Sequence, residues 1–151
     1  MARTIKGNEL AIQSYIFTTA KYDFNAYEKR IMYRLVEFAQ DEIKGIMIRD
    51  NMHKITPTIF GREITMPVAD ILRNEKDQNY TIAKKAFRSL AQKGVEYEDD
   101  EIWQYTSIIS SPKIDKIKGY VIFTVLDDIW RCLLDFTKGY RKYELVTAMQ
   151  F

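Results

Sequence analysis

The sequence predicts an α+β fold, in which helices flank a β-rich segment. Segments 25–43 and 80–93 repeat apolar residues at the three- and four-residue spacing of an amphipathic helix. Segment 102–125 is rich in β-branched and aromatic residues and contains two candidate strands. The chain has 151 residues, of which 46% are hydrophobic and 13% aromatic, so it is long and apolar enough for one folded domain with a core.

The N-terminal third predicts one well-defined helix. Residues 8–24 have no clear period, and we expect a short strand over residues 14–18. Asn25 is placed as an N-cap, and Glu28 three residues later completes a capping box. The helix that follows is predicted to run to Ile43.

Residues 45–66 are predicted to form a loop with short strands. Apolar residues are scattered through 45–60, where Pro57 argues against a central strand and a short hairpin is the expected structure. Segment 64–66 then predicts a brief strand that leads into Pro67.

Residues 67–94 predict a helix-turn-helix, around which the rest of the chain is organised. Pro67 to Leu72 predicts a short helix with proline at its first position, and residues 73–79 predict a polar turn. Tyr80 to Lys93 predicts a longer, basic helix with an apolar stripe, and Gly94 lies where a left-handed residue would end it. Helix, short turn and basic helix, in this order, are typical of the DNA-binding motif. The alternative interpretation is an ordinary amphipathic helix with a solvated basic face.

Two β-rich stretches that follow the basic helix predict a β-hairpin wing. Ile102 to Ser110 and Gly119 to Val125 are the expected strands, and the basic segment Ser111 to Lys118 is the loop between them. Apolar residues from Leu126 to Leu134 predict a further helix, which residues 136–140 break. Together these elements predict a winged helix with an additional N-terminal helix.

Charge is segregated along the chain, although the net charge is only +2. Segment 73–94 holds six lysines and arginines against two acids, whereas segment 95–101 holds five acids and no base. A polyanion such as DNA is attracted to the first segment and repelled by the second. The candidate DNA-binding residues of the turn, the basic helix and the wing loop are Arg73, Lys76, Lys84, Lys85, Arg88, Lys113, Lys116 and Lys118.

The predicted hairpin carries aromatic residues that indicate a subunit contact. Trp103, Tyr105 and Tyr120 are expected to share one face of this hairpin. Three interpretations are open: filling the core and its edge, stacking on bases, and pairing with a second copy of the chain. We take these three as candidate dimerisation residues and predict a homodimer.

The residue types that carry catalysis or bind metals are scarce. His53 is the single histidine and Cys132 the single cysteine, so the sequence predicts no histidine pair, zinc site or disulfide framework. The chain has no glycine-rich phosphate-binding loop, and the acidic residues 99–101 are interpreted as a solvated turn. We therefore expect no metal, no cofactor and no enzymatic activity. The N-terminus lacks a signal sequence and no apolar run reaches about 20 residues, which predicts a cytoplasmic protein without membrane contact.

Three groups of residues carry a family resemblance. They are Asn8-Glu9-Leu10, Ser14-Tyr15 and Tyr27 to Met32; then Ser110-Ser111-Pro112 and Gly119 to Phe123; then Leu134 to Thr137, Tyr140 and Lys142 to Leu145. In this order and spacing, over nearly the whole chain, they resemble the plasmid replication initiators of the Rep_3 type, which bind the repeats of plasmid origins.

The resemblance implies a function and a domain organisation. It implies that residues 1–151 form the N-terminal winged-helix domain of a longer, two-domain initiator whose second winged helix lies outside this chain. Such a domain dimerises in the repressor form and touches the DNA backbone in the initiator form, while the second domain reads most bases. The expected function is initiation of plasmid replication at double-stranded origin repeats, with host replication proteins as further partners. A transcriptional repressor and a protein-interaction module without DNA contact are the alternatives.

Overall fold

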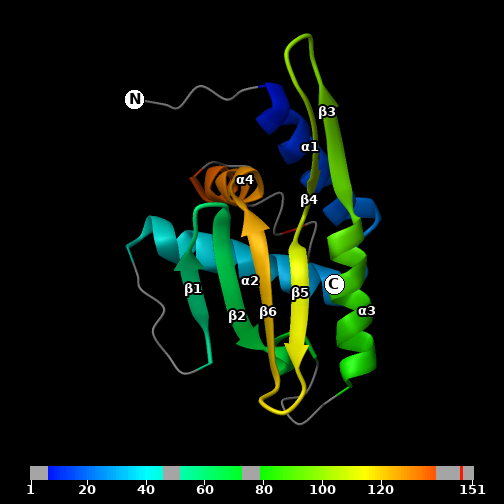
Figure 1. Ribbon diagram of the computed structural model, residues 1–151, viewed down its shortest axis with the longest axis vertical. Coiled ribbons are helices and arrows are strands. Elements are labelled where there is room, and N and C mark those ends of the chain that lie inside the picture. The colour runs from blue at the N-terminus through cyan, green and yellow to red at the C-terminus, as the bar shows by residue number, and fades with distance from the viewer. Residues whose placement is uncertain (1–6, 46–51, 73–78, 139–146, 148–151) are drawn as a thin grey trace.

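The computed structural model describes residues 7–45, 52–72, 79–138 and 147, and Figure 1 shows how its elements are arranged. In chain order the elements are α1 (Gly7–Tyr22), α2 (Ala26–Ile43), β1 (Lys54–Pro57), β2 (Gly61–Pro67), the 3-10 turn η1 (Val68–Asp70), α3 (Tyr80–Gln92), β3 (Gly94–Glu98), β4 (Trp103–Ser107), β5 (Ser110–Asp115), β6 (Tyr120–Leu126) and α4 (Asp127–Lys138). None of the described helices is both long and apolar enough to span a membrane.

The larger of two sheets is antiparallel, with strand order β1-β2-β6-β5. In Figure 1, α2 crosses behind this sheet, α4 lies at its upper end, and α3 stands beside the edge strand β5. Strands β3 and β4 form a separate two-stranded sheet that projects past α1. The α+β class predicted from the sequence is confirmed.

One face of the larger sheet forms the floor of the core. Every second residue of β6 is buried, namely Val121, Phe123 and Val125, as expected for a strand with one covered face. The ring of Phe87 from α3 meets the ring of Phe123 at a centroid distance of 5.5 Å, so α3 is packed directly on the sheet. Full burial of an aromatic side chain of this size contributes about 2 kcal/mol to folding.

The N-terminal segment forms the helix α1, so the short strand expected over residues 14–18 is wrong. The buried face of α1 carries polar residues among the apolar ones, because α4 supplies partners for them. Gln13 donates to Asp135 (3.2 Å), and the buried Glu9 carboxylate lies 3.9 Å from the Arg131 guanidinium. These polar residues interrupt the apolar period that would have indicated a helix.

Helix α2 begins and ends where the sequence predicts. Asn25 Oδ1 accepts from Glu28 N (2.8 Å) and Glu28 Oε1 accepts from Asn25 N (3.2 Å), which is the predicted capping box. Of the hairpin expected within 45–60, only strand β1 lies there, with Pro57 in this edge strand. Its partner is β2, which contains the brief strand predicted at 64–66 and extends it to residues 61–67. Residues 46–51 lie outside the described residues.

The first helix of the predicted helix-turn-helix is reduced to the single turn η1. Pro67 is the last residue of β2, with an extended ψ of 140°, and not the first residue of a helix. Val68 N donates to the carbonyl oxygen of Gly119 (2.9 Å), which ties this segment to the residue that directly precedes β6. Residues 73–78 of the predicted turn lie outside the described residues.

Helix α3 has the predicted extent, but Gly94 plays a different part from the one expected. Lys93 is extended (φ −87°, ψ 126°), so the chain passes directly into β3 without a left-handed residue. A Cβ atom at Gly94 would lie 2.6 Å from the Tyr105 hydroxyl and 2.7 Å from the Thr106 carbonyl oxygen. Glycine is therefore needed here because β4 approaches closely.

The two strands expected to form the wing do not pair with each other. β4 pairs with β3, the wing is the hairpin of β5 and β6, and most of the expected basic loop is strand β5. Ile108 and Ile109 are neighbours and both fully buried, which departs from strand alternation, so the chain leaves one sheet here and enters the other. A bulge between Ser110 and Lys113, with Ser111 at a φ of 52°, completes the change of direction.

Helix α4 extends beyond its expected end, so the break predicted at residues 136–140 does not begin at Phe136. Phe136 follows the buried Ile129 and Leu133 at helical spacing and is itself buried, and this contact with the core carries the helix onward. Residues 139–140 lie outside the described residues.

A polar cluster joins α2, β2 and α4. The Glu42 carboxylate accepts from Arg62 Nε (2.8 Å) and Trp130 Nε1 (3.0 Å), and the Arg62 guanidinium lies 5.7 Å from the centre of the Trp130 ring. Burial on its own raises the pKa of Glu42, but the two hydrogen bonds and the Arg62 charge outweigh it and hold this pKa below its ordinary value. The ionised carboxylate therefore stabilises the fold.

We expect the stability that Glu42 supplies to disappear in acid. Because its pKa is lower in the folded state than in the unfolded chain, the contribution is complete above the unfolded pKa and is lost as the pH falls through the folded pKa. Glu42→Gln should lower the unfolding free energy by about 1–2 kcal/mol at neutral pH, and the difference from wild type should shrink as the pH falls through the folded-state pKa of Glu42. Urea denaturation across this pH range measures the effect.

A matched control is Glu63→Gln, which changes an exposed carboxylate on the same strand β2. It should alter the unfolding free energy by less than about 0.5 kcal/mol. A difference between Glu42→Gln and wild type that stays constant with pH would contradict the assignment.

Candidate nucleic-acid interface

Helix α3 presents its basic residues to solvent because its apolar stripe is buried. Asn79 Oδ1 accepts from Ile82 N (3.3 Å) and caps the start of the helix. The buried stripe consists of Ala83, Ala86, Phe87 and Leu90. Lys84, Lys85 and Arg88 lie on the remaining surface and are exposed, so the predicted orientation of this basic face is confirmed.

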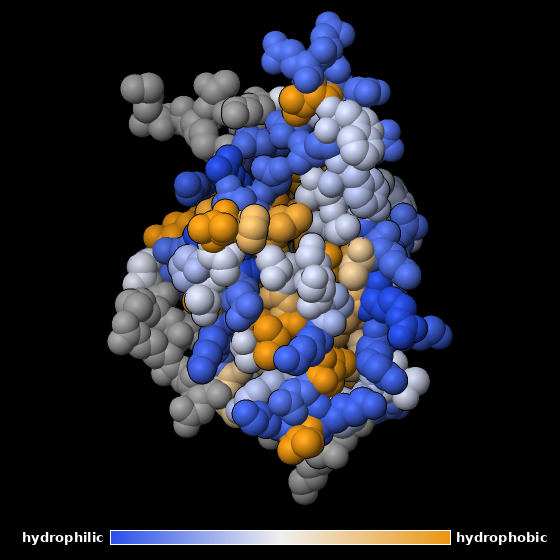
Figure 2. Space-filling model, in the orientation of Figure 1, coloured by the Kyte–Doolittle hydropathy of each residue, from blue (hydrophilic) through white to orange (hydrophobic). Residues whose placement is uncertain are grey.

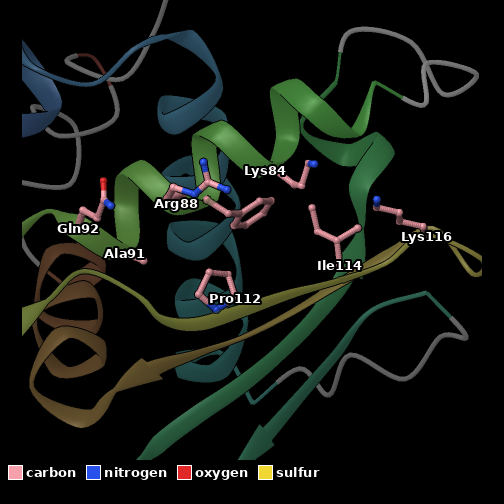
Figure 3. Close-up of a pocket in the computed structure, with 8 residues that line it drawn as sticks. Lys84, Arg88, Ala91, Gln92, Pro112, Ile114 and Lys116 are labelled. Carbon is pink, nitrogen blue, oxygen red and sulfur yellow. The ribbon is translucent and has the colours of Figure 1, made fainter.

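A groove of about 470 Å³, here called the α3–β5 groove, separates α3 from strand β5 (Figure 3). Its floor includes the apolar residues Pro112 and Ile114, and its rim includes Lys84, Arg88 and Lys116. Figure 3 shows Lys84 from α3 and Lys116, which directly follows β5, pointing toward one another, with Ile114 below the gap between them. Cations from two distant parts of the sequence thus meet around one groove.

A second groove, of about 760 Å³, lies between α3 and the start of α2 and is here called the α2–α3 groove. Lys85 and Arg88 line it from α3, and residues 25–27 line it from α2. Arg88 lines both grooves, so it stands on the ridge between them. The start of an 18-residue helix also contributes partial positive charge to this side of α3.

The orientation of α3 is fixed by a buried carboxylate on α2. Glu28, only 2% exposed, accepts from Lys93 Nζ (2.6 Å) and from Ser89 Oγ (3.0 Å). Lys93 Nζ also donates to the Asp23 carbonyl oxygen (3.2 Å). Lys93 belongs to the basic segment of the sequence, but this pairing turns its charge toward the protein. No local pattern signals the contact, which joins residues 65 positions apart.

The wing tip is a tight turn held by backbone hydrogen bonds. Asp115 Oδ1 accepts from Ile117 N and Lys118 N (both 3.0 Å), and the Asp115 carbonyl oxygen accepts from Gly119 N (2.8 Å). The bond from the Lys118 backbone is the main cause that holds the pKa of Asp115 below its ordinary value. Tyr80, in the first turn of α3, donates its hydroxyl to the Lys116 carbonyl oxygen (3.2 Å). The wing tip and the start of α3 therefore form one edge.

The structure brings together four of the eight predicted DNA-binding residues, three around the α3–β5 groove and Lys85 in the α2–α3 groove. Lys113 and Lys118 are exposed on the wing but line neither groove. Arg73 and Lys76 lie outside the described residues.

The candidate dimerisation residues fall on two different sheets. Trp103 and Tyr105 lie on the outer face of β4, 60% and 52% exposed, and the Trp103 indole donates to Glu96 Oε1 (3.1 Å). Tyr120 lies on β6 of the larger sheet, where its hydroxyl is 3.5 Å from the Met52 sulfur. The expectation that all three share one face is wrong, because β4 pairs with β3 and not with β6.

The acidic segment forms the tip of the β3–β4 hairpin. Asp99 Oδ1 accepts from Glu101 N (2.8 Å) and Ile102 N (2.9 Å), and Asp99 Oδ2 accepts from the Tyr97 hydroxyl (2.9 Å). These bonds, that from Ile102 first, hold the pKa of Asp99 below its ordinary value. Figure 2 shows that the top of the molecule, where the β3–β4 hairpin ends in Figure 1, is strongly hydrophilic. The interpretation of residues 99–101 as a solvated turn is confirmed.

The histidine and the cysteine both contact other elements of the fold. His53 Nε2 lies 2.6 Å from Asp70 Oδ2 and joins the start of β1 to η1, and Cys132 is buried with its sulfur 3.8 Å from the Glu9 carbonyl oxygen. Within the described ranges, no three histidine, cysteine or acidic side chains gather as a metal ion would require.

The chain is similar to known proteins both in its sequence and in its fold. The family model for the initiator replication protein WH1 matches residues 10–151. The crystal structure of the MSBI1.176 WH1 domain, a replication protein isolated from a multiple sclerosis patient, superposes with a TM-score of 0.53 at 12% identity, over 94% of this chain and 97% of that one. No curated protein sequence matches the chain. The structural likeness confirms the winged-helix fold.

We expect Lys93 to stabilise the fold by neutralising Glu28. Lys93→Met should lower the unfolding free energy by roughly 3 kcal/mol, because it leaves the Glu28 carboxylate buried without its cationic partner. Glu28→Gln added to Lys93→Met should recover part of the loss, since glutamine removes the buried charge and still completes the capping box. Urea denaturation of the two variants measures both effects.

The control is Lys85→Met, which removes an exposed lysine of the same helix. It should change stability by less than about 0.5 kcal/mol. If Lys93→Met is as stable as this control, the Glu28–Lys93 ion pair does not contribute to the unfolding free energy.

Proposed function

The chain belongs to the family of initiator replication proteins, as a WH1 domain, and on that premise we propose that it binds the double-stranded DNA of a replication origin through α3 and the β5–β6 wing. Family membership places the chain in the initiation of DNA replication. The proposal adds the surface and the mode of contact.

The observation that carries the proposal is the convergence of Lys84, Arg88 and Lys116 on the α3–β5 groove. Phosphate oxygens are the ligands that such a cluster of exposed cations attracts, and each neutralised phosphate releases condensed counterions. Lys113 and Lys118 are further exposed cations of the wing. Contacts of this kind set the position of a protein on the duplex and carry little sequence information.

The distribution of acids supports the same surface. The acidic tip of the β3–β4 hairpin projects from the upper end in Figure 1, whereas the wing tip lies at the opposite end of the larger sheet. A duplex lying across α3 and the wing is therefore kept away from residues 96–101. The acidic segment adjoins the basic helix in sequence, but it is separated from the wing in space.

We also propose that the outer face of the β3–β4 sheet is the homodimer contact. Trp103 and Tyr105 give this face an aromatic surface of the kind enriched at protein interfaces. Tyr120 is left out of this proposal, since it lies on the other sheet. Dimerisation on this face leaves α3 and the wing accessible.

We expect removal of the basic face to weaken DNA binding without loss of sequence preference. Lys84→Ala, Lys85→Ala and Arg88→Ala together should reduce affinity for origin DNA and for random duplex DNA by similar factors, because phosphate contacts carry little sequence information. Each lost contact should also flatten the slope of log affinity against log salt by about 0.9. Fluorescence anisotropy at several salt concentrations measures both quantities.

The matched control replaces Lys21, Lys44 and Lys138, three exposed lysines away from both grooves, and so makes the same change in net charge. It should leave the salt slope close to that of wild type. A folded basic-face variant with unchanged affinity and slope would show that this face is only solvated surface.

We expect the exposed aromatic face of β4 to hold the dimer together. Specific interfaces bury roughly 1,200–2,000 Å², so removal of two large central side chains should dissociate the pair. Trp103→Ser with Tyr105→Ser should sediment as a monomer at micromolar concentration, where wild type sediments as a dimer. Phe60→Ser, an exposed aromatic residue in the β1–β2 turn, is the control and should remain dimeric. A wild-type monomer at all concentrations would contradict this part of the proposal.

A further inference from the structure

Ile117 stands at the outermost point of the wing and is 98% exposed. Single exposed apolar side chains are common on proteins and need no explanation by themselves. Ile117 differs because it occupies a turn, where β-branched residues are disfavoured, and because it lies between the exposed lysines Lys116 and Lys118.

The turn holds Ile117 in a fixed position. Asp115 binds the backbone N–H groups of both Ile117 and Lys118, and Gly119 adopts a left-handed φ of 76° that closes the turn. The Gly119 carbonyl oxygen accepts from Val68 N, which anchors the tip to η1. An apolar side chain on a preorganised turn loses little conformational freedom when it binds.

The position of the tip relative to α3 is also fixed. The Tyr80 hydroxyl is bonded to the Lys116 carbonyl oxygen, and Figure 3 shows the Lys116 side chain directed toward Lys84. Ile117 therefore projects from the same edge of the molecule as the basic helix. The apolar tip, the lysines beside it and the start of α3 can meet one ligand together.

A second exposed isoleucine provides an internal comparison. Ile59 is 92% exposed in the β1–β2 turn, at the opposite end of the sheet, next to Thr58 and Phe60 and without neighbouring lysines in sequence. Among the residues that the structure describes, the wing tip alone places an exposed large apolar residue between two lysines.

We propose that Ile117 is a wedge that enters the minor groove of duplex DNA and partly separates two stacked base pairs there. This inference rests on the proposed DNA-binding function. The minor groove is narrow and carries a strong negative potential, which the two flanking lysines complement. An isoleucine side chain at the phosphate surface would stay exposed to water and add no binding free energy. Apolar side chains inserted between base steps, in contrast, bury their surface and kink the duplex.

The wedge makes a prediction about DNA that phosphate contacts do not make. Pyrimidine–purine steps unstack easily, whereas A-tracts are stiff. A wedge should therefore favour a duplex of alternating T and A over a homopolymeric A-tract of equal length. Both duplexes have the same charge and the same base pairs, so contacts to phosphates alone give no preference for the alternating sequence.

The test uses these two duplexes, each of about 24 base pairs, with dyes at both ends to report bending. Wild type should bind the alternating duplex more tightly and bend it. Ile117→Ala should bind the alternating duplex about 5- to 10-fold more weakly, bend it less, and leave A-tract affinity and the salt slope almost unchanged. Ile117→Leu should retain the preference, and Ile59→Ala should behave as wild type.

The remaining outcomes separate this inference from the function on which it rests. If replacement of Lys84, Lys85 and Arg88 weakens binding to both duplexes while Ile117→Ala binds and bends like wild type, the wedge is wrong and the phosphate interface stands. If wild type binds neither duplex, both proposals fail. If Ile117→Ala keeps full DNA affinity but loses binding to vesicles of anionic phospholipid, the tip contacts lipid and the wedge is overturned.

Discussion

The orientation of the basic helix depends on one buried charge, the carboxylate of Glu28. Its first oxygen completes the capping box of α2, and its second receives Lys93 and Ser89 from the far end of α3. A carboxylate that is almost fully removed from water is costly unless it is paired and hydrogen-bonded. The capping box fixes where this charge lies, so the end of α3 must come to it. The apolar stripe of α3 packs this helix against the sheet, and the pairing of Glu28 with Lys93 fixes where α3 lies along α2.

Directional polar contacts also join the other elements around the candidate interface. Glu42 joins α2 to β2 and α4 through Arg62 and Trp130, and Tyr80 joins the start of α3 to the wing tip. Hydrogen bonds between elements are directional, whereas apolar contacts permit sliding. The Tyr80 hydrogen bond thus ties the start of α3 to the wing tip, beside the groove that Lys84 and Lys116 flank. A surface that binds a regular ligand such as a duplex benefits from cations at fixed distances.

Local patterns predicted the parts of the fold that local physics determines. The capping box of α2 and the apolar stripes of α2 and α3 are formed by residues that are close together in the sequence. Helix α1 was not predicted because its buried face contains the polar residue Gln13, which interrupts the apolar period. Its hydrogen-bond partner, Asp135, lies near the other end of the chain. The wing was misassigned because adjacent buried isoleucines, Ile108 and Ile109, mark a change of sheet that resembles one continuous strand. For the candidate site, the sequence predicted which residues are basic, but the meeting of Lys84 with Lys116 depends on strand pairing across the whole domain.

The separation of charge in space has a consequence for how the domain would approach DNA. The cations of α3 and the wing lie toward one end of the molecule, and the acidic tip of the β3–β4 hairpin lies at the other (Figure 1). In the field of a duplex such a molecule experiences a torque as well as an attraction, because the basic end is drawn in and the acidic end is pushed out. The net charge is only +2, which limits non-specific attraction to DNA at long range. The uneven distribution of charge therefore affects the orientation of the domain on DNA more than the rate at which the two meet. Repulsion of the hairpin also keeps the exposed face of Trp103 and Tyr105 away from the duplex, where a second copy of the chain can reach it. Binding DNA at one end and a partner at the other are thus compatible, and the opposite signs of charge help to keep the two surfaces apart.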